Sequence, residues 1–130
     1  MVALSEIEIQ DEFLLVRIQG GAFRPIDIMS TISKIRKSLK ESKKNRILVV
    51  RQVPVKIITS LFYLYKLAEY LMFQDISNFK VALVFPEEMH TENMKLFVMA
   101  SQNRGLKFCL FSEYNDGEAW LMSPDPVISD

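Results

Sequence analysis

The chain has 130 residues, 49% of them hydrophobic, which suits one globular domain with its own core. Its 16 basic and 16 acidic residues cancel, so the overall charge predicts no nucleic-acid partner. The first residues lack the basic and apolar runs of a signal peptide, and no apolar stretch approaches the roughly 20 residues of a membrane span. A single cysteine excludes an internal disulfide framework and suits a reducing compartment. We therefore expect a cytoplasmic protein without stable membrane insertion.

The first third of the chain predicts a hairpin followed by a helix. Ile7–Gln10 and Phe13–Gly20 read as two short strands, joined by a polar segment that is short enough for a hairpin. Pro25 suits the first position of a helix, because the backbone N–H that it lacks would have no partner there. The apolar stripe of this helix has helical spacing and consists of Ile28, Ile32, Ile35 and Leu39.

The rest of the chain alternates strands with helices. The expected strands are Arg46–Val50, Lys80–Phe85 and Leu106–Phe111, and the expected helices are Ile57–Phe73, Glu92–Arg104 and Gly117–Met122. Gly105 suits the left-handed position just past a helix, and Asp116 suits the N-cap of the last helix. This alternation predicts an α/β fold: a mostly parallel sheet of about five strands, an antiparallel edge strand and four helices. We expect one domain over residues 1–122 and a loose C-terminal tail over residues 123–130.

Residue types that carry out catalysis are scarce. The one histidine, His90, lies in a polar loop whose acidic residues are Glu87, Glu88 and Glu92. Their spacing matches no defined metal site, and acidic residues also suit the start of a helix. Cys109 lies inside an apolar strand, where a cysteine is usually a small core residue. We therefore expect no enzyme activity, no cofactor and no metal ion.

A basic cluster on and after the first helix is the densest charge feature. It consists of Lys34, Arg36, Lys37, Lys40, Lys43, Lys44 and Arg46. Such a cluster is typically the solvated back of an amphipathic helix. The alternative is a salt-sensitive contact with phosphates or with an acidic partner.

The second helix has apolar side chains on two sides. One stripe should cover the sheet and consists of Ile57, Leu61, Leu64, Ala68 and Leu71. The aromatic residues expected on the opposite side, around Lys66, are Phe62, Tyr63, Tyr70 and Phe73. An exposed aromatic patch is unusual on a soluble monomer, and tyrosine is enriched at interfaces. We interpret these residues as an interface, most simply with a second copy of the chain. The alternatives are that loops or the tail cover them, or that the helical phase is shifted.

Several segments resemble the STAS-like superfamily, namely "LVRIQGGAF", "RILVV", "KVALVF" and "ASQNRGLKFCLFSEYNDGEAWL". This is the fold of bacterial anti-sigma-factor antagonists and of the cytoplasmic domains of sulphate transporters. At the level of residues the match is mainly over Ala100–Leu121, where the chain looks like a branch of small bacterial proteins, most of them uncharacterised. The resemblance implies a regulatory interaction module. Together with the aromatic residues of the second helix and the scarcity of catalytic residues, it predicts a non-enzymatic protein that binds another protein or itself.

The resemblance also raises the question of a phosphorylation switch. Anti-sigma-factor antagonists carry a phosphorylatable serine, in an Asp-Ser-Ser-Gly-like motif, at the start of the helix after the central strand. This chain reads "RQVPVKIITSLF" there and lacks the aspartate and the glycine. Thr59 and Ser60 are the candidate hydroxyl groups for phosphate, and helix capping is their alternative role.

A second class of function is also open, because the STAS-like fold has nucleotide-binding members and a likeness to lipid-carrier domains. Open parallel sheets bind ligands beyond the carboxyl ends of their strands. The residues near those ends are Arg51, Gln52, Pro86, Glu87, Ser112 and Glu113. Arg51 is the candidate contact with a phosphate or carboxylate, and a surface salt bridge is its alternative role.

Overall fold

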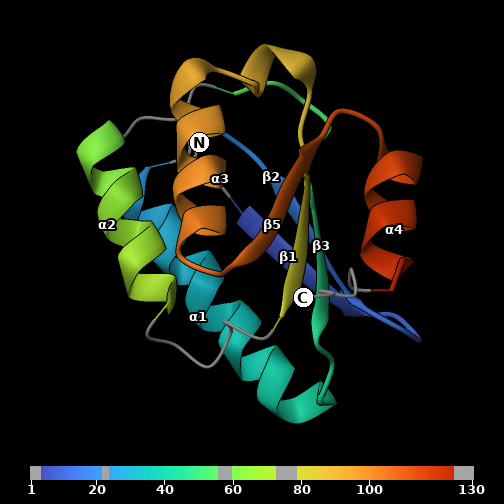
Figure 1. Ribbon diagram of the computed structural model, residues 1–130. Helices are drawn as coiled ribbons and strands as arrows, with labels where there is room; N and C mark the ends of the chain where they lie inside the picture. The colour runs from blue at the N-terminus through green and yellow to red at the C-terminus, as the bar shows by residue number, and fades with distance from the viewer. Residues whose placement is uncertain (1–3, 22–23, 56–59, 73–78, 125–130) are drawn as a thin grey trace, which may run out of the picture.

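The computed structural model describes residues 4–21, 24–55, 60–72 and 79–124 (Figure 1). Its strands are β1 (Leu4–Ile9), β2 (Leu14–Gln19), β3 (Arg46–Val50), β4 (Lys80–Val84) and β5 (Lys107–Phe111). Its helices are α1 (Pro25–Ser42), α2 (Leu61–Met72), α3 (Glu92–Asn103) and α4 (Tyr114–Met122), with a short 3-10 helix, η1, at Glu87–Met89.

The strands form one sheet in the order β1-β2-β3-β4-β5. The hairpin strands β1 and β2 are antiparallel, and every other neighbouring pair is parallel. The predicted α/β architecture is thus confirmed, including the antiparallel strand at one edge. Right-handed crossovers between strands in sequential order place their helices on the same face of the sheet. Helices α1, α2 and α3 accordingly lie on one face, whereas α4, which follows the last strand, lies on the other (Figure 1).

Each face of the sheet has its own hydrophobic core. Successive residues of a strand point to opposite faces, so Leu14 and Val16 pack under α1–α3 while Leu15 packs under α4. All five residues of β4 are buried, as expected for a central parallel strand. The core beneath α1–α3 is the larger one, and it contains the cavity described below.

The expected end of α3 is confirmed. Gly105 has a φ of 87°, which favours glycine, and its N–H donates to the carbonyl of Gln102 over 3.0 Å. The N–H of Leu106 donates to the carbonyl of Ser101, also over 3.0 Å. These two bonds form a Schellman motif, which satisfies the last carbonyl groups of the helix.

The expected start of α4 is wrong. The helix begins at Tyr114, so Asp116 lies in its first turn and Glu113 is the N-cap residue, without a side-chain cap bond. Gly117 is a buried residue inside the helix, packed against the sheet. An Asp-Gly pair normally indicates a turn, but here the glycine serves a close approach between helix and sheet.

Helix α2 buries Leu64, Leu67 and Ala68. Leu64 and Ala68 were expected to face the sheet, whereas Leu67 was not included in that stripe. The side chains of Leu61 and Leu71 and the whole of Ile57 lie outside the described residues, so their expected positions remain predictions. Across the described ranges, no helix is both long enough and apolar enough to cross a bilayer.

Candidate functional site

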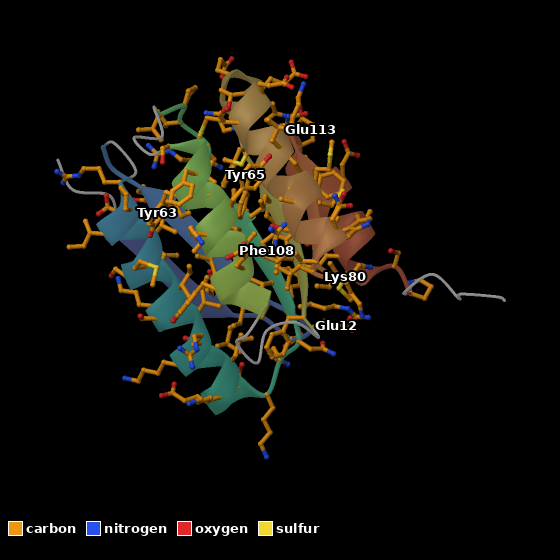
Figure 2. The ribbon with its side chains drawn as sticks, turned by 60° about the vertical axis from the view of Figure 1, so that its left-hand side comes forward. Glu12, Tyr63, Tyr65, Lys80, Phe108 and Glu113 are labelled. Carbon is orange, nitrogen blue, oxygen red and sulfur yellow. The ribbon has the colours of Figure 1, made fainter. Side chains whose placement is uncertain are left out.

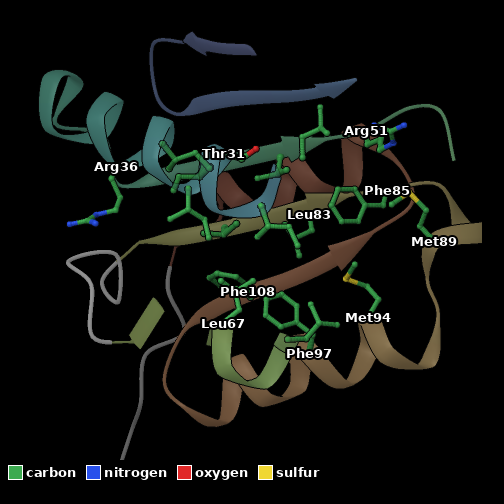
Figure 3. A pocket seen from close by; sticks show the side chains of 18 residues that line it. Thr31, Arg36, Arg51, Leu67, Leu83, Phe85, Met89, Met94, Phe97 and Phe108 are labelled. Carbon is green, nitrogen blue, oxygen red and sulfur yellow. The ribbon is translucent and has the colours of Figure 1, made fainter. Parts of the chain in front are cut away.

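A cavity of about 150 Å³ lies between the sheet and helices α1, α2 and α3 (Figure 3). Its walls come from β2 to β5 and from the inner sides of the helices, and they are almost entirely apolar. The polar residues in the lining are Thr31, Arg36 and Arg51. The cavity itself was not predicted, because its existence depends on the distance between the three helices and the sheet.

Arg51 directly follows β3 and is only 3% exposed. Its Nε donates to the carbonyl of Val53 over 2.8 Å, and its Nη2 donates to the carbonyl of Gly20 over 2.6 Å. The remaining nitrogen, Nη1, is buried and has no hydrogen-bond partner among the described residues. Loss of hydration on burial lowers the pKa of Arg51.

Arg51 therefore does not form the surface salt bridge that was its alternative role. The ion pairs of the described chain do not include it. Among the other residues at the strand ends, Pro86 is half-buried and the rest are exposed, namely Gln52, Glu87, Ser112 and Glu113. Of this set, only Arg51 lines the cavity.

The outer side of α2 is the second candidate site. Phe62 is 69% exposed, and the Nζ of Lys66 stands 5.5 Å from the centre of its ring. Tyr70 is 36% exposed, whereas Tyr63 is half-buried. Figure 2 shows Tyr63 and Tyr65 on opposite sides of the helix. Phe73, the remaining aromatic residue predicted for this interface, lies outside the described residues.

Charged groups lie between the aromatic residues of α2. Nζ of Lys66 lies 3.7 Å from Oε2 of Glu69, and Nη2 of Arg104, the C-cap residue of α3, lies 3.5 Å from Oε1 of Glu69. We call the exposed residues Phe62, Lys66 and Tyr70, together with the half-buried Glu69, the α2 outer face. It combines one highly exposed ring with a cation and an anion one helical turn apart.

Solved structures of two other proteins share this arrangement of strands and helices. One is an anti-sigma factor antagonist from Mycobacterium paratuberculosis, with a TM-score of 0.59, 11% identity and coverage of 94% of this chain and 96% of that one. The other is an uncharacterised protein with a SpoIIAA-like fold from Shewanella loihica, with a TM-score of 0.52, 17% identity and coverage of 92% and 93%. The chain has the STAS-like fold. No protein-family model and no curated protein matches it.

In this STAS-like domain, Ser60 lies at the start of the helix after the central strand. Its hydroxyl accepts a hydrogen bond of 3.1 Å from the N–H of Tyr63, as a helix-capping side chain does. The residue is exposed. Thr59, the other candidate for phosphorylation, lies outside the described residues.

The histidine and cysteine of the domain occupy structural positions. Nε2 of His90 lies 2.9 Å from the carbonyl oxygen of Phe85, which ties the loop of η1 to the end of β4. Throughout the part of the chain that the structure describes, no three histidine, cysteine or acidic residues are grouped to hold a metal ion. Cys109 is half-buried, and loss of hydration raises the pKa of its thiol.

Two members of the basic cluster connect α1 to the hairpin. Nζ of Lys34 donates to the carbonyl of Ser5 over 3.3 Å, and Nζ of Lys44 donates to the carbonyl of Asp11. These contacts give both lysines a structural role.

Lys80 is buried at the start of β4 and was not among the predicted site residues. Its Nζ donates to the carbonyl of Trp120 over 2.6 Å and to that of Ser123 over 2.8 Å. It also lies 4.6 Å from the centre of the Trp120 ring. Lys80 therefore binds the C-terminal end of α4, where a cation is favoured. The sequence feature that could have identified Lys80 is its charge, because it stands at the start of an otherwise apolar strand.

Proposed function

We propose that this STAS-like domain is a regulatory protein-interaction module without enzyme activity, and that it self-associates through the α2 outer face. The observation that carries the proposal is the 69% exposure of Phe62 on a helix whose opposite side is already buried in the core. Exposed aromatic rings of this kind lose their contact with water when a partner covers them. The likeness of the fold to an anti-sigma factor antagonist, a protein named for its action on another protein, is further support.

The charges of the α2 outer face favour a second copy as the partner. In a two-fold symmetric interface the same surface patch serves both chains. Two α2 helices packed antiparallel would place Lys66 of each copy beside Glu69 of the other, while Phe62 contributes apolar contact. The existing Lys66–Glu69 distance of 3.7 Å shows that both charges lie on one surface of the helix.

The roles of His90 and Cys109 support the assignment to a class without enzyme activity. The imidazole is bonded to a backbone carbonyl of its own loop. The thiol has a raised pKa, which lowers its nucleophilicity at neutral pH. A cytoplasmic location is part of the proposal, and the free cysteine supports it.

Sedimentation equilibrium of the full chain at micromolar concentrations tests self-association. We expect a dimer whose dissociation constant rises by about tenfold or more in Phe62→Glu, because the glutamate would be buried at the centre of the interface. Met99→Glu is the matched control, since Met99 is an apolar residue that is also 53% exposed but belongs to α3 and not to α2. A monomer at every concentration, or an equal effect of the two variants, would refute the proposal.

A charge exchange tests the two-fold arrangement separately. Lys66→Glu and Glu69→Lys should each weaken the dimer, because each places like charges opposite one another. The double variant Lys66→Glu/Glu69→Lys should recover most of the lost affinity. Without recovery the antiparallel pairing is wrong, even where Phe62→Glu still disrupts the dimer.

A further inference from the structure

We propose that the outer edge of β1 binds an extended segment of another protein as an added strand, and that the residues of this segment alternate between basic and apolar. β1 is an end strand of the sheet, so β2 is its neighbour on one side only. Such an edge is a template for pairing with another chain. The surface is separate from the proposed self-association, because β1 contacts β2 and α1, whereas α2 packs against α3.

The register of the hairpin determines which backbone groups of β1 point to the open edge. The N–H of Gln10 donates to the carbonyl of Phe13 over 2.9 Å, so these residues form a hydrogen-bonded pair of the ladder. Such pairs alternate with pairs whose N–H and C=O groups point away from the partner strand. With the observed register, the outward residues of β1 are therefore Ser5, Ile7 and Ile9.

A contact with α1 supports this assignment. Nζ of Lys34 donates to the carbonyl of Ser5 over 3.3 Å, and that carbonyl is free to accept because it is not directed at β2. Among the described residues, no group forms a hydrogen bond with the outward N–H or C=O of Ile7 or Ile9. Both isoleucines therefore offer a donor and an acceptor to an added strand, at the spacing that a ladder requires.

The side chains of β1 specify the chemistry of the partner. Ile7 packs on the core beneath α1–α3, and Ile9, which has the same parity in the strand, is 55% exposed. Glu6 and Glu8 point to the opposite face and are exposed. Directly opposed side chains of neighbouring strands lie on the same face, where opposite charges or two apolar groups stabilise the pair. A strand with basic residues opposite the glutamates and apolar residues opposite the isoleucines therefore fits this edge.

Negative charge exceeds positive charge around these glutamates. Glu8 forms an ion pair with Arg17 over 3.0 Å, whereas Glu6 has no ion pair among the described residues. Burial raises the pKa of Tyr114 in α4, and the carboxylates of Glu118 and Glu8 raise it further against the opposing charge of Arg17. The acidic groups of β1 and α4 thus act on the same region. A basic strand would balance their charge.

The same glutamates disfavour a second copy of the chain at this edge. Two β1 strands related by a two-fold axis would run antiparallel, with the outward residues of one bonded to those of the other. With Ile7 opposite Ile7 of the second copy, each Glu6 would face a Glu8. In the two neighbouring registers, Glu6 would face Glu6 or Glu8 would face Glu8. Like charges directly opposite one another destabilise a strand pair, so a different protein is the better partner.

Fluorescence anisotropy of labelled peptides tests the inference on the full chain. The probe is Val-Lys-Val-Lys-Val-Lys-Val with both ends blocked. One control replaces every lysine by glutamate, and the other keeps the composition but places the three lysines together. We expect the probe to bind about tenfold or more tightly than either control, because only the probe presents lysines on one face and valines on the other. No binding of the probe, or equal affinity for the probe and either control, would overturn the proposal.

Amide hydrogen exchange followed by NMR tests the direction of the contact. A saturating concentration of the probe should slow exchange at Ile7 and Ile9 by about tenfold or more, because their N–H groups then donate to the peptide. The amides of Glu6 and Glu8 already bond to β2 and should change less. Binding of the probe with unchanged exchange at Ile7 and Ile9 would overturn the assignment to this edge.

Two pairs of variants locate the site. Ile9→Pro removes an outward N–H without removing a bond to β2, and it should weaken the probe by about tenfold or more. Ile9→Ala keeps the N–H and should weaken the probe less. Glu6→Lys should reverse the preference between the lysine and glutamate peptides, whereas Glu88→Lys, at an exposed position of η1, should not. Unchanged affinity in Ile9→Pro, or an unchanged preference in Glu6→Lys, would overturn the proposal. Should Ile9→Pro fail to fold, Glu6→Lys decides.

The same titration on Phe62→Glu separates this inference from the proposed function. The probe should bind this variant with unchanged affinity, whether or not the variant dimerises. Loss of binding in folded Phe62→Glu would show that the strand site requires the α2 outer face, contrary to the inference.

Discussion

Gly117 in α4 lies so close to Val84 in β4 that a side chain does not fit between them. A Cβ atom built on Gly117 would stand 2.5 Å from Cγ2 of Val84 and 3.4 Å from Cδ1 of Leu48. Val84 is β-branched and buried, so its methyl group has little freedom to move aside. The glycine therefore determines how closely α4 approaches the sheet.

Replacing Gly117 by alanine should lower the free energy of unfolding by about 1–3 kcal/mol, the usual cost of overpacking a core. At an exposed helical site, the same substitution would raise the free energy of unfolding, because alanine has a higher helix propensity than glycine by about 1 kcal/mol. Urea unfolding followed by circular dichroism measures the change. Asn115→Ala, at an exposed position of the same helix, is the control and should stay within about 0.5 kcal/mol of the original. A stabilising Gly117→Ala would contradict the close approach.

Lys80 should be needed for the stability of the C-terminal helix. Replacing it by methionine keeps most of the apolar stem but removes the ammonium group that binds the carbonyls of Trp120 and Ser123. We expect a loss of about 2 kcal/mol in the free energy of unfolding, as is typical for hydrogen bonds to a charged group. Lys95→Met, at an exposed position of α3, is the control and should change little. An equal effect of the two variants would mean that the buried ammonium group contributes nothing specific.

The order of the elements was predictable, because strands and helices of this chain differ clearly in apolar period. The position of Gly117 was not. Asp116-Gly117 carries the local signal of a turn, and only the packing of α4 on Val84 makes a helical glycine favourable. Short helices such as α4 also offer too few turns for periodicity to locate their first residue.

The candidate sites were predictable only in part. Arg51 was identified from its place at the end of a strand, but its burial depends on the carbonyl of Gly20, 31 residues earlier in the chain. Lys80 is likewise bound by groups 40 and 43 residues away. The cavity depends on the spacing of three helices over the sheet. The local sequence pattern can mark such residues as unusual, but it does not show which distant groups they contact.

Cys109 should react slowly with iodoacetamide while the protein is folded. Burial raises the pKa of its thiol, and this outweighs the opposing effects of the Leu110 backbone hydrogen bond and the positive charge of Lys80. At a pH between the ordinary thiol pKa and the raised one, the unfolded chain is largely thiolate and the folded chain largely thiol. Because the thiolate is the nucleophile, alkylation followed by mass spectrometry should show its midpoint at higher pH in the folded chain. The chain unfolded in guanidinium is the control, and faster reaction of the folded form would contradict the prediction.

Ser60 should stabilise α2 through its cap. Replacing it by alanine removes the acceptor for the N–H of Tyr63 and should cost about 1 kcal/mol in the free energy of unfolding, measured in urea. Ser60→Asp is the matched variant and should retain most of the stability, because a carboxylate also accepts that bond and is favoured at the N-terminus of a helix. A phosphate on the same oxygen would be favoured for the same electrostatic reason, so phosphorylation at this position is compatible with an intact helix. If Ser60→Asp destabilises the domain more than Ser60→Ala does, the start of α2 disfavours negative charge and a phosphorylation switch at Ser60 would act by disrupting the helix.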